Sequence, residues 1–227
     1  MHKRVLITHI PYDWPGGEDQ HVTSLVKAYS AIGFEVRVFT GQGLQKDLST
    51  SFQSIISSGV SSYKAELDAF NPSLVHLHNI FPVLGPALLA SFRRRSAPVV
   101  MTAHNHRLFC SNGLAYRKGA ICELCVNAKT MWRPAIYNCN GDQAKSLYYA
   151  GALTRIREAN LWHDSIDAWI APSPYMMGML NRQGVPDEKI FLIPHNVDFA
   201  STEVPERDFD FIFAGRLSVE KGVENLI

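Results

Sequence analysis

Two cations near the end of the printed chain, Arg216 and Lys221, stand in a pattern that suits phosphate binding. They lie in the segment GRLSVEKG, where Ser218 and Glu220 are typical of the first turn of a helix. A helix N-terminus presents free backbone amides, and arginine and lysine add charge-assisted hydrogen bonds to an anion. We therefore interpret Gly215, Arg216 and Lys221 as a phosphate site, with an ordinary strand–turn–helix carrying solvated charges as the alternative.

Gly16 and Gly17 precede a segment, 19–31, whose apolar residues recur at helical spacing. Amides at such a helix start can face an anion or a sugar hydroxyl, although a plain turn also explains a glycine pair. His21, one helical turn later, either faces the same cleft or is a surface histidine, which is the more ordinary interpretation. We take Gly16 and Gly17 as a candidate phosphate or acceptor loop.

His104 follows an apolar stretch, 98–103, that predicts a buried strand. In open parallel sheets, ligands bind beyond the carboxyl ends of the strands. A histidine there can donate a hydrogen bond to a ligand hydroxyl or stabilise charge near a reacting carbon. The alternative is a histidine that only satisfies the end of the strand. His76 and His78 alternate along another predicted strand, 74–78, where they can bind a metal or serve packing and hydrogen bonding.

Four cysteines fall in a stretch, 105–142, that fits no helix or strand of regular length: Cys110, Cys122, Cys125 and Cys139. Their spacing includes a C-x2-C pair, which can supply two corners of a tetrahedral zinc site. The polar loops between them have no core of their own, so a metal would organise them. We predict a structural zinc that four thiolates would close to substrate; unligated or redox-bonded thiols are the alternative.

The elements that must position these groups alternate along the chain, which predicts a parallel sheet joined by right-handed crossovers. The predicted strands are 5–8, 34–40, 74–78, 98–103, 166–171, 189–193 and 209–214, and the predicted helices are 19–31, 62–70, 83–95, 144–162 and 173–184. The fold class is therefore α/β, with a Rossmann-like parallel sheet. Residues 1–200 form the first domain, 201–207 a linker, and 208–227 the first strand and partial helix of a second Rossmann-like domain.

GRLSVEKG resembles the GRL-x-x-EKG motif of glycosyltransferase family 4, whose members have the retaining GT-B fold of two Rossmann-like domains. The segments GGEDQHV and TAHN, and the cysteine stretch with RLFC-x-NG and C-x-x-C, are similar to further parts of that family. The resemblance implies that Arg216 and Lys221 hold the diphosphate of a nucleotide sugar. It also implies that His104 contacts the donor sugar and that Gly16 and Gly17, in an acceptor-side domain, approach donor phosphate and acceptor.

The reaction that this resemblance implies is transfer of a sugar from a nucleotide sugar to a glycan or lipid-linked acceptor. It would proceed with retention at the anomeric carbon and no obligatory metal, in bacterial surface polysaccharide synthesis. The family's paired glutamates would follow Ile227, so we expect a truncated chain that is inactive, or nearly so, alone. Two other classes remain open: a non-catalytic module that binds a glycan or a partner, and a GT-B epimerase of nucleotide sugars.

Composition excludes several other classes. With 46% hydrophobic and 19% charged residues, the 227-residue chain can bury a core, and its net charge of +1 provides no broad basic surface for nucleic acid. No apolar run has the length of a signal peptide or membrane span, which predicts a cytoplasmic protein. Three consecutive arginines, 93–95, are either a solvated face or a peripheral contact with anionic lipid at the inner face of the membrane.

Overall fold

The computed structural model describes residues 3–11, 16–42, 60–94, 97–126, 128, 130–196 and 211–226. Several expectations lie outside these ranges: Arg95, the linker 201–207 and the first residues of the last predicted strand, 209 and 210.

A six-stranded parallel sheet forms the centre of the fold, in the order β2-β1-β3-β4-β7-β8. The strands are β1 Arg4–Thr8, β2 Glu35–Phe39, β3 Leu74–Leu77, β4 Val99–Thr102, β7 Ala168–Ala171 and β8 Ile190–Leu192. All neighbouring pairs are parallel. This architecture confirms the predicted Rossmann-like α/β class, because each parallel strand is reached through a crossover that places a helix on the sheet.

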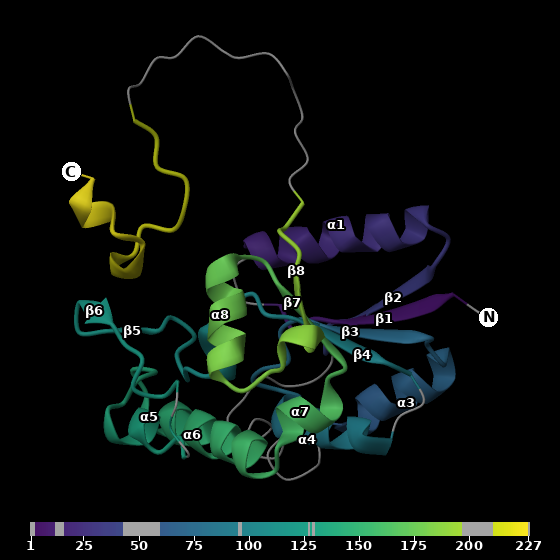
Figure 1. Ribbon diagram of the computed structural model, residues 1–227, viewed down its shortest axis with the longest axis horizontal. Helices are drawn as coiled ribbons and strands as arrows, with labels where there is room; N and C mark the ends of the chain where they lie inside the picture. The colour runs from purple at the N-terminus through teal and green to yellow at the C-terminus, as the bar shows by residue number, and fades with distance from the viewer. Residues whose placement is uncertain are drawn as a thin grey trace.

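Helices cover both faces of the sheet, with α1 on one and α3, α4, α6 and α7 on the other (Figure 1). They are α1 Gly17–Ala31, α3 Val60–Phe70, α4 Gly85–Ser91, α6 Gln143–Glu158, α7 Leu161–Ser165 and α8 Pro174–Arg182, with single 3-10 turns at Phe92–Arg94, His106–Leu108 and Asp187–Lys189. Strand β1 shows why both faces are needed. Val5 and Ile7 pack under α1, whereas Leu6 joins the larger core on the opposite face.

Local signals explain where several helices start and stop. Ser173 caps α8 by accepting a hydrogen bond from the amide of Met176 at 3.2 Å, with Pro174 at the first helical position. The predicted helix 144–162 is instead two helices, α6 and α7. The break falls at Asn160, whose φ of 52° is left-handed and cannot continue an α-helix.

The cysteine stretch contains only short elements: strands β5 Tyr116–Arg117 and β6 Ala120–Ile121 form a small antiparallel hairpin, and α5 Arg133–Ile136 is a single turn. The stretch has no separate core of its own, but four of its apolar side chains pack into the core of the sheet domain. Leu108, Phe109, Val126 and Met131 are buried in the main hydrophobic core of the domain. Burial of these four side chains therefore holds the stretch against the sheet domain whether or not a metal is bound.

The predicted strand 209–214 is not present over its described part, residues 211–214, which have no regular secondary structure. Phe211 and Ile212 are 80% and 91% exposed, and the following residues form two 3-10 turns, Val219–Lys221 and Val223–Asn225 (Figure 1, yellow). An apolar run becomes a stable strand only when neighbouring strands pair with its backbone and other elements cover its side chains. Among the described residues, no strand pairs with this segment.

Candidate functional site

Histidines gather where strands of the sheet end at their carboxyl edge. The register pairs Thr8 of β1 with Leu77 of β3, so His9 and His78 leave the sheet side by side. His104 follows the next strand, β4. The ring centroids are 6.2 Å apart for His9 and His78 and 4.9 Å apart for His78 and His104. The edge predicted to bind ligands is therefore lined by imidazoles from three strands.

His104 lies at the centre of this cluster. Its Nε2 is 2.6 Å from Nδ1 of His78, and its Nδ1 is 3.1 Å from Nε2 of His195. Burial, then the neighbouring imidazoles with His195 first, lowers the pKa of His104 to about 2. The ring is therefore neutral near pH 7, and each of these hydrogen bonds needs one protonated and one bare nitrogen.

The two histidines of the third strand differ in their surroundings. His76 is buried between the hydroxyls of Tyr29, 3.1 Å from Nδ1, and Thr102, 2.8 Å from Nε2, which confirms a hydrogen-bonding role. Burial lowers its pKa to about 3. His78 is 2% exposed, and its Nε2 is buried with no hydrogen-bond partner among the described residues. Burying a nitrogen without a hydrogen-bond partner costs about 1–3 kcal/mol. The burial of His78 is therefore energetically unfavourable, whereas hydrogen bonds compensate the burial of His76.

The start of α1 is tied to the same edge through His9. The amide of Gly16 donates to one carboxylate oxygen of Asp19 at 2.7 Å, while the other lies 2.9 Å from Nε2 of His9. Glu18 lies 3.4 Å from the other ring nitrogen of His9. Burial would lower the pKa of His9, but hydrogen bonds and charge from Glu18 and Asp19 outweigh it and raise that pKa.

The two glycines of the candidate loop are not required by the fold itself. Gly16 has an extended backbone, with φ of −141°, and a Cβ there would approach only the Asp19 carboxylate, at 4.0 Å. A Cβ on Gly17 would meet no atom of the described residues within 4 Å. Against this described part of the chain, the start of α1 leaves room for a ligand.

Two further histidines complete the cluster. The rings of His21 and His195 have centroids 4.0 Å apart, and the ring of His21 is 5.3 Å from that of His104. The surface interpretation of His21 is therefore wrong, because α1 begins at the carboxyl edge and turns this side chain inward. The sequence patterns did not single out His9 and His195 as site residues. His9 directly follows β1 and His195 lies near the end of β8, so a position after a strand, as for His104, could have indicated both.

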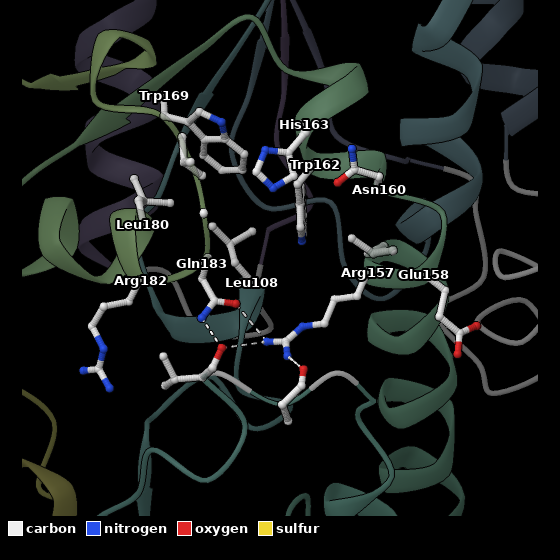
Figure 2. Close-up of a pocket in the computed structure, with 15 residues that line it drawn as sticks. Leu108, Arg157, Glu158, Asn160, Trp162, His163, Trp169, Leu180, Arg182 and Gln183 are labelled. Carbon is white, nitrogen blue, oxygen red and sulfur yellow. Dashed lines mark hydrogen bonds between the residues drawn. The ribbon is translucent and has the colours of Figure 1, made fainter.

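Cavities lie in different parts of the domain. A small one of about 20 Å³ is lined by residues that include Glu18, His78 and His104, and it has room for one water-sized group. Figure 2 shows a larger one, of about 540 Å³, between the ends of α6, α7 and α8. There Arg157 donates to the carbonyl of Cys125 and to the side-chain oxygen of Gln183, both at 2.8 Å. None of the candidate site residues lines the larger cavity, so we assign it no role in the site.

The candidate phosphate residues are solvent-exposed. The Arg216 side chain is 75% exposed and lies 3.6 Å from Glu220, and Lys221 is also exposed. Gly215 precedes them with no regular structure. Within the described residues, no hydrogen bond or ion pair joins this segment to the histidine cluster. The structure therefore brings Gly16, Gly17 and His104 to one edge of the sheet. It shows no contact between the candidate phosphate residues and the described residues of this edge.

The four cysteines are all described, all partly buried, and none is in a disulfide. Burial, then charge interactions with Cys110, Cys139 and Cys122, raises the pKa of Cys125 to about 11. No three of these four described sulfur atoms lie within 4.8 Å of one another. The donor set thus suits a zinc site with four thiolate ligands, in which the charge of the ion would stabilise neighbouring thiolates, but the sulfurs would need to move closer to bind one ion.

A parallel sheet with polar side chains gathered beyond its strand ends defines a Rossmann-like domain, a class of fold in which ligands bind at that edge. Residues 15–201 match the family described as Glycosyltransferase Family 4, and the chain belongs to that family. A search of curated proteins finds no match. The family places the chain among transferases that bind a sugar donor and an acceptor. Among the described residues, no helix combines the length and apolar character that crossing a membrane requires.

Proposed function

We propose that this chain provides the acceptor-side domain of a retaining glycosyltransferase that moves a sugar from a nucleotide sugar to a glycan or lipid-linked acceptor. The supporting observation is the open helix start at Gly16 and Gly17 on the same edge as His104. The bond from the anomeric carbon to the diphosphate breaks, a bond to the acceptor oxygen forms, and the acceptor proton is released. Synthesis of bacterial surface polysaccharide is the proposed setting, with peripheral contact at the inner membrane face where the acceptor is lipid-linked.

His104 suits a role beside the donor sugar because its ring is neutral. A neutral imidazole can donate one hydrogen bond to a sugar hydroxyl without adding a positive charge next to a developing oxocarbenium ion. Its two neighbours, His78 and His195, hold the ring in one orientation through hydrogen bonds at both nitrogens. A hydroxyl would replace one of these contacts, which keeps the ring satisfied with and without donor.

Arg216 and Lys221 would hold the diphosphate, as part of a second, donor-side domain that starts near residue 208. Both side chains are exposed and available to a ligand, and the Arg216 contact with Glu220 is long at 3.6 Å. The planar guanidinium can grip two phosphate oxygens, and lysine adds a point charge. Together they would stabilise the negative charge on the leaving diphosphate.

A panel of nucleotide sugars, incubated with candidate acceptors and the full-length protein that carries both proposed domains, tests this function. Acceptor-dependent release of a nucleoside diphosphate, with a product that retains the anomeric configuration, is the expected result. Interconversion of nucleotide sugars without diphosphate release would assign an epimerase instead. Glycan binding without nucleotide-sugar turnover would assign a non-catalytic binding module.

Replacing Gly17 by alanine is expected to raise the KM for the donor about 10-fold or more, because the new methyl group narrows the open helix start. The free energy of unfolding should stay constant or rise by up to about 1 kcal/mol, because alanine is the better helix former. Steady-state kinetics and urea unfolding measure the two effects. Gly178→Ala is the matched control, because Gly178 lies within α8 and a Cβ there also meets nothing within 4 Å. Equal KM values for both variants would contradict a ligand at Gly17.

The cysteine stretch is proposed to hold a structural zinc through Cys110, Cys122, Cys125 and Cys139, with no role in the chemical step. Replacing Cys122 by serine is expected to remove one zinc per chain and to lower the Tm by roughly 5 °C or more, because the thiolate ligand and its ion are both lost. Elemental analysis and thermal unfolding provide the measurements. Native protein in which this zinc is absent and all four thiols react freely would contradict the proposal.

A further inference from the structure

Three histidines from three different elements converge at the carboxyl edge of the sheet. His21 is on the second turn of α1, His78 follows β3, and His104 follows β4. Each offers one ring nitrogen, and the three nitrogens all lie within 4.8 Å of one another. Nitrogens bound to one tetrahedral ion, each about 2.0 Å from it, are separated by little more than 3 Å. Small rotations of these rings would therefore form a three-nitrogen metal site.

Two ring nitrogens of these histidines have no hydrogen-bond partner among the described residues. Nε2 of His78 is buried in a side chain that is only 2% exposed, and it has no hydrogen bond within the described parts of the chain. Nδ1 of His21, in a side chain that is partly buried, also has no hydrogen-bond partner among the described residues. A cation bound at either nitrogen would supply the partner that it lacks. The buried His76 differs from these histidines, because both of its ring nitrogens have hydroxyl partners.

The surroundings supply the remaining features of a metal site. The ring of His195 lies 4.0 Å from that of His21, where it can act as a fourth ligand. The adjacent cavity of about 20 Å³, lined by Glu18, His78 and His104, has room for one metal-bound water. The ring of His9, whose Nε2 contacts Asp19, has its centroid 6.2 Å from that of His78.

We propose that His21, His78 and His104 bind one divalent first-row transition cation, of which Zn²⁺ is the representative, in the cleft of this domain. Neutral imidazoles favour zinc, copper, nickel and cobalt, whereas magnesium and calcium prefer oxygen ligands. The site rests on its own geometry and does not depend on the proposed transferase activity. Since His104 is also the proposed contact of the donor sugar, a bound ion would compete with the donor.

Titration of the native protein with Co²⁺, without a polyhistidine tag, tests the site directly. Nitrogen-bound Co²⁺ gives visible bands without the thiolate charge-transfer absorption that the cysteine site would give, so one spectrum separates the two sites. The nitrogen-type ion is expected to bind at one per chain and to be displaced by Zn²⁺ but not by Mg²⁺. His21→Gln should weaken its binding by at least about 100-fold, since loss even of an outer partner costs 10–100-fold.

His163→Gln is the control, because His163 lies on α7 away from the cluster, and it should bind Co²⁺ as the native protein does. His21→Ala is a second variant that retains good helix propensity in α1, and circular dichroism checks that both His21 variants are folded. Nitrogen-type binding that is equal in the native protein and the folded His21 variants would overturn the site, as would its absence from the native protein. Activity on nucleotide sugars does not enter this experiment, so its result is independent of the proposed function.

Discussion

Replacing His104 by alanine is expected to lower kcat/KM for sugar transfer by about 100-fold or more. The variant loses the proposed hydrogen bond to the donor sugar at a partly buried position. It also removes the ring that keeps His78 and His195 in place, through contacts of 2.6 and 3.1 Å. Steady-state kinetics of the native protein and the variant, with saturating acceptor and varied donor concentration, measure the change in kcat/KM.

Loss of structure must be separated from loss of a catalytic contact in this experiment. His104→Asn retains a hydrogen-bond donor on a shorter side chain, so it should recover part of the stability but little of the activity. Urea unfolding of both variants measures stability, and binding of the nucleotide sugar measures the donor contact. Unchanged kcat/KM in a folded His104→Ala protein would remove His104 from the active site.

The sheet could be predicted because its strands carry their own signal. Runs such as Leu74–Leu77 and Val99–Thr102 are short, apolar and buried on both faces, which is the pattern of a strand inside a parallel sheet. The aromatic run at 209–214 has the same local pattern but no strand in its described part. Local composition shows that a strand is possible, whereas pairing with neighbouring strands decides whether it forms.

The site could be predicted only where it depends on position along one strand. A site role for His104 could be predicted because this residue lies at the carboxyl end of β4. Its contact with His195, 91 residues away, depends on how β7, α8 and β8 return the chain to the same edge. The orientation of His21 depends on the angle at which α1 leaves the sheet, and helical periodicity alone does not determine that angle.

For the cysteine stretch, the sequence indicates a candidate set of metal ligands but not the packing that holds the stretch in place. Its spacing indicates a metal site, but the apolar residues that anchor it, Leu108, Phe109, Val126 and Met131, are too widely separated in sequence to form a helical or strand pattern. Arg157 from α6 adds a second anchor by donating to the backbone carbonyl of Cys125. Packing against the main domain therefore supplies order that the spacing of the cysteines does not reveal.

Acidification from pH 7.5 to pH 5 is expected to destabilise the metal-free protein steeply. His76, His78 and His104 have folded-state pKa values far below 6.5, mainly because they are buried. Once the pH falls below about 6.5, the unfolded chain takes up protons at these histidines and the folded chain does not. Their contribution to stability is therefore complete above pH 6.5 and is lost as the pH falls, at up to about 1.4 kcal/mol per pH unit for each histidine.

His9 acts in the opposite direction, because Glu18 and Asp19 raise its folded-state pKa. Its contribution is complete below pH 6.5 and is lost as the pH rises through the raised value, so it offsets part of the acid effect. Urea unfolding at several pH values, with a chelator present, measures the net slope. His76→Gln should reduce the slope by about one proton, because glutamine can still contact Tyr29 and Thr102 but does not titrate.

Tyr29→Phe provides the control for that slope. It removes the hydroxyl that contacts His76 at 3.1 Å but leaves the histidine in its buried position. We expect lower stability at every pH with the steep dependence below pH 6.5 retained. A native protein whose free energy of unfolding is constant between pH 7.5 and pH 5 would show that these imidazoles are protonated, or reached by water, in the folded state. The neutral cluster that supports both His104 as a donor contact and the three-nitrogen metal site would then not exist.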